Sequence, residues 1–101
     1  MIIIQTTIGS EKDAQELTKY LISKQLIACG TFHKVKSIYK WDKKIQQDFE
    51  YEISLYSKES LHEQLIETIK EQHTYELPKI TTLKPTYTLP EYEKWVNNET
   101  I

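Results

Sequence analysis

The chain has 101 residues, of which 39% are hydrophobic and 28% are charged, and its formal net charge is −2. These values fit one folded domain over residues 1–101, and they exclude an intrinsically disordered chain or a strongly basic nucleic-acid-binding arm. All 13 basic residues are lysines, and the absence of arginine argues against a phosphate-handling enzyme or a sequence-specific DNA reader, because both depend on the planar guanidinium group.

Cysteine content and hydropathy bear on the compartment. Cys29 is the single cysteine, so the chain cannot form an intrachain disulfide, which fits a reducing compartment. No segment approaches the roughly 18 consecutive apolar residues that a membrane span requires. We therefore expect a cytoplasmic protein that binds neither a membrane nor nucleic acid.

The first part of the chain predicts a strand followed by a helix. Ile2–Thr7 is rich in β-branched residues, and its continuous apolar start indicates burial on both faces. A helix is expected over about Ser10–Lys24, with Ser10 as the N-cap and acidic residues in the first turn. Its apolar residues recur at spacings of three and four, which gives the helix one apolar face.

Two long extended runs follow, joined by a polar turn. Ile27–Cys29 opens the first run, which is rich in β-forming residues from Phe32 to Trp41. After the polar break Asp42–Lys44, the segment Ile45–Leu55 alternates between apolar and polar residues and is the clearest strand of the chain. The two runs predict a long β-hairpin.

The remaining segments predict a helix, a short strand and a final helix. Ser60 and Glu63 have the spacing of a capping box, and the helix that they start should run to about His73. Ile80–Leu83 has the composition of a short strand, and the last helix should start with a cap near Thr88–Glu91. The inner face of that last helix is expected to carry Tyr92, Trp95 and Val96.

The predicted order is β-α-β-β-α-β with a C-terminal helix, which indicates the α+β class and a ferredoxin-like plait with both main helices on one face of the sheet. Strands in such sheets usually have about five or six residues, whereas the two hairpin runs hold roughly ten each. The hairpin should therefore leave the body of the domain, where an exposed apolar ribbon invites aggregation unless another chain covers it. We expect an oligomer formed through the hairpin.

Several stretches of the sequence resemble the signature stretches of the CutA divalent-cation-tolerance family: Leu26–Cys29, Ser37–Trp41, His73–Pro78 and Glu91–Trp95. They occur in the family's order with compatible spacing and cover almost the whole chain. The resemblance implies a ferredoxin-like fold, a homotrimer and a link to tolerance of divalent metals, for which copper binding is the usual proposal. It also implies a protein that is not an enzyme, because no enzymatic activity is firmly attached to the family.

The resemblance directs attention to metal ligands. Bacterial members proposed to bind copper use a cysteine in the first strand and two adjacent histidines at the end of the second helix, and these positions hold Gln5, Gln72 and His73 here. His73 is thus a candidate ligand, although an imidazole in the last turn of a helix also favours the helix dipole. Cys29 would suit copper(I), but small thiols in strands are more often simply buried. His73 and Cys29 are the candidates for copper or another divalent metal.

The hairpin turn departs from the family pattern. CutA proteins often have glycine in this turn, where the present chain has Lys43 between Asp42 and Lys44. A residue other than glycine indicates a different turn type or a left-handed backbone conformation.

An alternative function is a trimeric small-ligand sensor or adaptor that has no physiological metal and binds its ligand in a cleft between subunits. The candidate residues for such a cleft are Tyr39, Trp41, Lys44, Tyr75 and Glu76. The structural interpretation of the aromatic residues is that they pack the hairpin and the trimer interface. Further acidic residues alternate along the second hairpin strand, where they either collect cations weakly or form the solvated face of the sheet: Asp48, Glu50 and Glu52.

Overall fold

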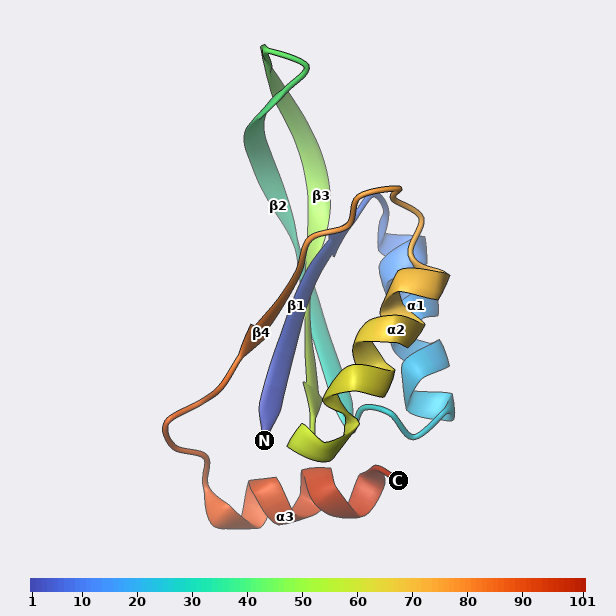
Figure 1. The fold of residues 1–101 in the computed structure, drawn as a ribbon, viewed down its shortest axis with the longest axis vertical. Helices are drawn as coiled ribbons and strands as arrows, with labels where there is room; N and C mark the ends of the chain where they lie inside the picture. Colours follow the sequence, from blue (N-terminus) through green and yellow to red (C-terminus); the bar gives the residue numbers. More distant parts are fainter.

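The computed structural model describes all residues, 1–101, as an antiparallel four-stranded sheet with two helices on one face and a third helix at its end (Figure 1). In chain order the elements are β1 (Ile2–Ile8), α1 (Glu11–Ser23), β2 (Cys29–Trp41), β3 (Lys44–Ser57), the 3-10 turn η1 (Glu59–Leu61), α2 (His62–Gln72), β4 (Ile80–Leu83) and α3 (Pro90–Glu99). The strand order is β2-β3-β1-β4. The predicted α+β, ferredoxin-like βαββαβ fold with a C-terminal helix is confirmed.

The core lies between the sheet and the two main helices. The strand residues that face the helices are fully buried at alternate positions: Ile2, Ile4, Thr6 and Ile8 on β1, and Ile53, Leu55 and Ser57 on β3. The helices pack against these strand residues with buried apolar side chains spaced four residues apart: Leu17 and Leu21 on α1, and Leu65 and Ile69 on α2. On the other face of β1, Ile3 and Gln5 are only half-buried, so the expected burial of both faces is wrong for the single chain.

Helix α1 begins and ends with local hydrogen bonds. Ser10 is the N-cap, as predicted, and its side chain accepts the backbone N–H of Asp13 at 3.1 Å. At the other end, the backbone N–H groups of Gln25 and Leu26 donate into the last turn, which is the Schellman arrangement. This arrangement holds Gln25 at a left-handed φ of 57°.

The starts of the other helices differ from the predictions. Ser60 does not cap α2, because it lies inside η1, and neither η1 nor α2 has a side-chain cap. Helix α3 begins at Pro90, and the first N–H of a helix has no partner within the helix, so proline is well tolerated there. Its N-cap is Leu89, which makes no side-chain hydrogen bond. Helix α2 ends at Gln72, and His73 is already extended with a ψ of 145°, so His73 lies outside the helical turn in which it was expected.

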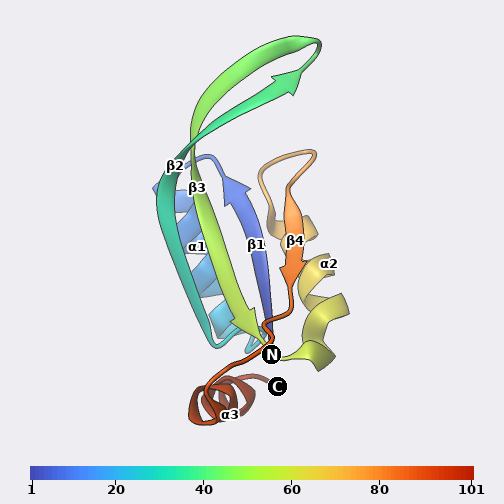
Figure 2. The ribbon, with the colours of Figure 1, turned by 90° about the vertical axis from the view of Figure 1, so that its left-hand side faces the viewer.

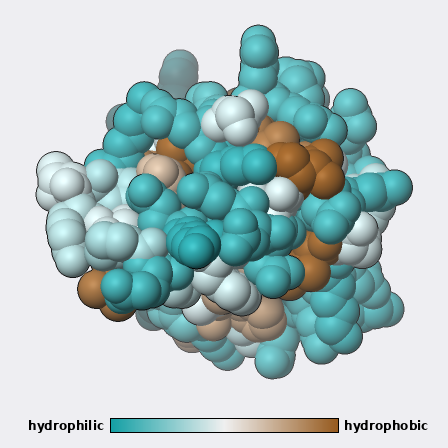
Figure 3. Space-filling model, turned by 90° about the horizontal axis from the view of Figure 1, so that it is seen from below, coloured by the Kyte–Doolittle hydropathy of each residue, from teal (hydrophilic) through white to brown (hydrophobic).

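Helix α3 lies across the end of the molecule opposite the hairpin tip (Figure 1). Val96 is buried and Tyr92 is half-buried, as predicted, but Trp95 is 43% exposed and does not belong to the buried face. Seen from this end, the surface is mostly hydrophilic, and its hydrophobic side chains form separate patches (Figure 3). No helix in the chain combines the length and the apolar character that crossing a membrane would require.

Strands β2 and β3 extend far beyond the rest of the sheet, as predicted. The pairing of β1 with β3 ends at Ile8 and Tyr51, so residues 35–50 of the hairpin have no β1 neighbour. We term residues 35–50 the hairpin arm; it projects from the body (Figure 1) and bends toward the side of the sheet that carries β4 (Figure 2). At its tip, Asp42 and Lys43 both have left-handed φ angles, 51° and 63°, as in a two-residue type I′ turn.

Candidate functional site

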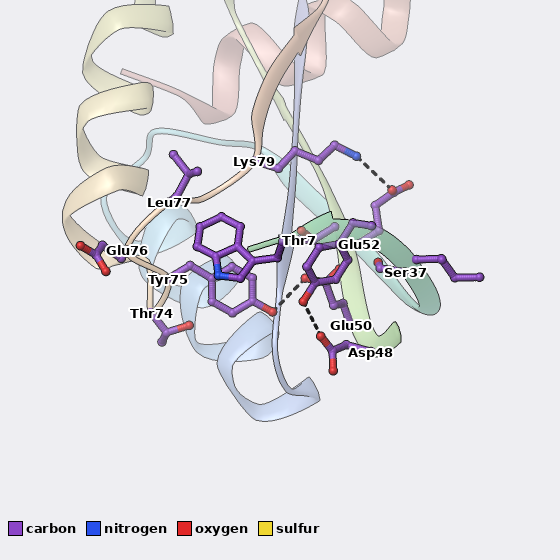
Figure 4. A pocket seen from close by; sticks show the side chains of 13 residues that line it. Thr7, Ser37, Asp48, Glu50, Glu52, Thr74, Tyr75, Glu76, Leu77 and Lys79 are labelled. Carbon is purple, nitrogen blue, oxygen red and sulfur yellow. Dashed lines mark hydrogen bonds and ion pairs between the residues drawn. The ribbon is translucent and has the colours of Figure 1, made fainter. Parts of the chain in front are cut away.

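A groove of about 1190 Å³ lies beneath the hairpin arm, on the sheet face that α1 and α2 leave open (Figure 4). Its walls come from the arm, from the adjoining part of β3, from the end of β1 and from the segment 74–79 that connects α2 to β4. The lining residues are Thr7, Ser37, Ile38, Tyr39, Trp41, Asp48, Glu50, Glu52, Thr74, Tyr75, Glu76, Leu77 and Lys79.

The groove contains most of the residues that the sequence suggests for a ligand cleft. Tyr39 and Trp41 come from β2, and Tyr75 and Glu76 come from the segment before β4. Lys44 does not line the groove. It lies at the tip of the arm, in a second depression of about 480 Å³ that it shares with Trp41.

Three carboxylates of β3 form one side of the groove. Asp48, Glu50 and Glu52 occupy alternate positions, so their side chains leave the strand on the same face. The hydroxyl of Tyr39 donates a hydrogen bond to Asp48. The hydroxyl of Tyr75 donates to Oε1 of Glu50 at 2.9 Å, which ties the segment before β4 to the arm (Figure 4).

The remaining charges lie toward the rim of the groove. Nζ of Lys79 is 3.4 Å from Oε2 of Glu52, and this is the one ion pair among the lining residues. Glu76 is exposed, and its carboxylate points away from the tyrosines (Figure 4). Glu50 and Asp48, rather than Glu76, are therefore the carboxylates that accept hydrogen bonds from aromatic side chains. With four acidic residues and one lysine, the groove is electronegative.

The two phenols of the groove are held in their protonated form. Burial raises the pKa of Tyr75 well above the ordinary value for tyrosine, and the hydrogen bond to Glu50 adds to this shift. The pKa of Tyr39 is also raised, chiefly by its hydrogen bond to Asp48. Both hydroxyl groups consequently act as hydrogen-bond donors to carboxylates, and they neutralise no acidic charge.

His73 contacts two residues that line this groove, Thr7 and Tyr75, and both of its ring nitrogens are engaged. Nδ1 accepts the backbone N–H of Tyr75 at 3.0 Å, and Nε2 lies 2.9 Å from the carbonyl oxygen of Thr7 and 3.1 Å from Oγ1 of Thr6. Since a carbonyl oxygen can only accept, Nε2 carries the proton, and the imidazole is the neutral tautomer. Burial lowers the pKa of His73. The imidazole of His73 is therefore neutral, and the expected positive charge beside the helix dipole is wrong.

Cys29 lies at the opposite end of the sheet from His73. It pairs with Tyr56 at the end of β3, whereas His73 contacts the end of β1 that adjoins the arm. Within the chain, no three His, Cys, Asp or Glu side chains come close enough to hold a metal ion. The residues of a single chain thus do not form a metal site at His73 and Cys29.

Six further residues complete the groove, and the sequence did not single them out as site residues: Thr7, Ser37, Ile38, Thr74, Leu77 and Lys79. The alternation of β3 did place Asp48, Glu50 and Glu52 on a common face. That face is a groove wall because segment 74–79 crosses the end of β1, and no local pattern in the sequence indicates this path. The one available signal was Pro78, which forces the chain out of the helix before β4.

Comparison with known proteins agrees with this fold over its full length. The family model for the CutA1 divalent ion tolerance protein matches residues 2–99. The divalent-cation tolerance protein CutA of Pyrococcus horikoshii is 36% identical over 100 residues, covering 99% of this chain and 98% of the relative. The protein of the same name from Thermotoga maritima is 34% identical over 101 residues, covering all of both chains.

The similarity extends to the arrangement of the backbone. The crystal structure of Pyrococcus horikoshii CutA in the presence of 3 M guanidine hydrochloride superposes with a TM-score of 0.98 at 36% identity, covering 100% of each chain. The family model covers nearly every residue, and the relatives and the fold agree with it. The chain belongs to the CutA1 divalent ion tolerance protein family.

Proposed function

We propose that this CutA-family chain acts as a homotrimeric, non-enzymatic binding protein, and that neighbouring copies close the groove beneath the arm into a cleft between subunits. One observation carries the proposal. The arm exposes Trp41, Ile45 and Phe49 at 58%, 76% and 61% of their surface, far from the core. A long hairpin with exposed apolar side chains favours association, because a second chain can cover those side chains. The number of three subunits rests on the resemblance to the family.

The oligomeric state is tested by sedimentation velocity on the purified chain. We expect a species of three times 12.0 kDa at micromolar concentration. Ile45→Lys/Phe49→Lys should dissociate it, because each substitution places a charge in the covered surface. The matched control is Ile22→Lys on α1, which is 45% exposed but lies away from the arm. A wild-type chain that sediments as a monomer contradicts the proposal.

A role in metal tolerance is supported by the family, and copper is the metal to test first. The candidate ligands are His73 and Cys29. For His73 to bind, it would have to release the N–H of Tyr75 from Nδ1 or the carbonyl of Thr7 from Nε2. Calorimetric titration of copper into wild type, His73→Ala and Cys29→Ser decides the question, with His33→Ala as a control on an exposed histidine. Stoichiometric binding that His73→Ala abolishes supports this site, and no binding at micromolar concentration removes it.

The groove favours a second candidate, a small-ligand sensor or adaptor that binds between subunits. Four of the five residues expected in such a cleft line the groove, whereas the two expected metal ligands lie apart. A growth assay for divalent-metal tolerance separates the candidates when the gene is replaced by variants that remain trimeric. Loss of tolerance in His73→Ala or Cys29→Ser supports the metal site. Normal tolerance in both of these variants supports the ligand cleft, for which metals are incidental.

A further inference from the structure

The hairpin arm segregates its charges between two faces. Strand pairing places Lys36 opposite Phe49 and Lys40 opposite Ile45 on the arm, and Lys34 opposite Tyr51 at its base. Alternation puts these pairs on the side of the sheet that faces the helices. We term this surface, with Lys34, Lys36 and Lys40, the lysine face. The intervening pairs, which include Asp48 and Glu50, belong to the groove side. One arm thus carries a cationic face and an anionic face, back to back.

The lysine face has no anionic partner within its own chain. Lys34, Lys36 and Lys40 are exposed, and none of them takes part in an ion pair. Lys34 and Lys36 instead lie over the ring of Phe49, with Nζ at 4.5 and 5.9 Å from its centre. Ammonium groups beside exposed apolar side chains form a surface that fits an acidic partner with aromatic groups.

The groove has that complementary chemistry. It carries four carboxylates against the single Lys79, and it adds the aromatic side chains Tyr39, Trp41 and Tyr75. Asp48 and Glu50 receive hydrogen bonds from tyrosine hydroxyls, and neither forms an ion pair with a cationic side chain of its own chain. At about 1190 Å³, the groove can hold several side chains of a partner.

The lysine face and the groove side of one arm cannot pair with each other, because they point in opposite directions. The occupant that supplies the matching charge is a second copy of the chain. We propose, building on the trimer of the proposed function, that the lysine face of each arm packs against the groove of the next copy, where Lys34 and Lys36 meet Asp48 and Glu76. Such a contact joins two different surfaces, so it must close into a ring to end the assembly, and each cleft is complete only with lysines from its neighbour.

Charge reversal tests this pairing. Lys34→Glu/Lys36→Glu reverses the lysine face, and Asp48→Lys/Glu76→Lys reverses two exposed positions of the groove. Each double variant should weaken the trimer on the order of tenfold or more in dissociation constant, because like charges then face each other. The quadruple variant restores opposite charges at every contact and should recover most of the affinity. Lys12→Glu/Lys19→Glu on α1 carries the same change in net charge and serves as the control.

The readout is the dissociation constant from sedimentation equilibrium, at low salt and in 0.5 M sodium chloride, with circular dichroism to confirm folding. Weakening in both double variants, recovery in the quadruple variant and an unchanged control support the proposal. If none of the charge reversals alters the affinity of the trimer, the proposed pairing of the lysine face with the groove is wrong. The trimer itself then remains supported. A double-variant defect without recovery in the quadruple variant also overturns it. A wild-type monomer overturns the trimer itself.

Discussion

The imidazole of His73 connects the backbone of Tyr75 to the backbone of Thr7, with Nδ1 accepting from one at 3.0 Å and Nε2 lying 2.9 Å from the other. This bridge fixes the start of segment 74–79 against the end of β1. The hydroxyl of Tyr75 then reaches Glu50 on the arm. A histidine that the sequence suggests for metal binding therefore positions the wall of the groove, and it does so in its neutral form.

The first prediction concerns the dependence of stability on pH. The pKa of His73 is lowered in the folded state, mainly by burial, relative to an unfolded value of about 6.5. The unfolded chain therefore binds the proton more readily, and the contribution of His73 to stability is complete above about pH 6.5 and is lost as the pH falls through the folded-state pKa. Urea unfolding at pH 7.5 and pH 5.5 should show a smaller loss of stability for His73→Gln than for wild type.

His33 provides the matched control, because it is exposed on β2. His33→Gln should retain the wild-type dependence on pH. Equal losses in wild type and His73→Gln would mean that other groups determine the acid sensitivity, and the neutral bridge would not be a stabilising feature.

The second prediction concerns the packing of α1 on β2. A Cβ atom at Gly30 would lie 2.5 Å from Cγ2 of Thr18 and 3.2 Å from Cδ2 of Leu55. Gly30→Ala should therefore destabilise the fold by about 1–3 kcal/mol, as expected for overpacking of a tight core. Thr18→Ser removes the methyl group at the shortest contact, and it should recover part of this loss when combined with Gly30→Ala.

A double-mutant cycle by denaturant unfolding measures this coupling. The two substitutions should be less destabilising together than the sum of their separate effects. Additive losses would show that Gly30→Ala acts through Leu55 or through the backbone, and not through Thr18.

The third prediction concerns the end of α1. Gln25 adopts a φ of 57°, which is strained for a residue with a Cβ atom and relaxed for glycine. Gln25→Gly should raise the free energy of unfolding by about 0.5–1 kcal/mol, after allowance for the greater freedom of glycine in the unfolded chain. Lys24→Gly, at the preceding position with a φ of −87°, should lower it. Thermal unfolding of the two variants beside wild type compares these opposite signs.

Most of the fold could be predicted from local patterns. The alternation of Ile45–Leu55 follows directly from the two faces of a strand, and Ser10 caps α1 because its side chain competes well for the free N–H groups of the first turn. The capping box at Ser60 failed because a 3-10 turn precedes α2, and a short motif cannot distinguish that turn from the start of the helix.

The candidate site was less predictable because tertiary contacts assemble it. Tyr39 and Trp41 share a face with the carboxylates of β3 through the register of the two strands. The path of segment 74–79 depends on the bridge made by His73, and that bridge joins residues 66 positions apart. Lys44 is a cleft residue in the sequence-based prediction, and this part of the prediction is wrong. The type I′ geometry instead keeps it at the tip of the arm, beyond the groove.

The last prediction contrasts the two tyrosines of the groove. Tyr75 is half-buried, and its hydroxyl donates to Glu50 at 2.9 Å, whereas Tyr39 is exposed and its hydrogen bond to Asp48 lies at the surface. A hydrogen bond to a charged acceptor stabilises more when water cannot replace it, so Tyr75→Phe should cost about 1–2 kcal/mol. Tyr39→Phe should leave the stability of the isolated chain unchanged. Urea unfolding of both variants, under conditions in which the chain is monomeric, measures the difference. Equal effects would mean that the contact between Tyr75 and Glu50 does not hold segment 74–79 to the arm, and the groove would then lack a fixed wall.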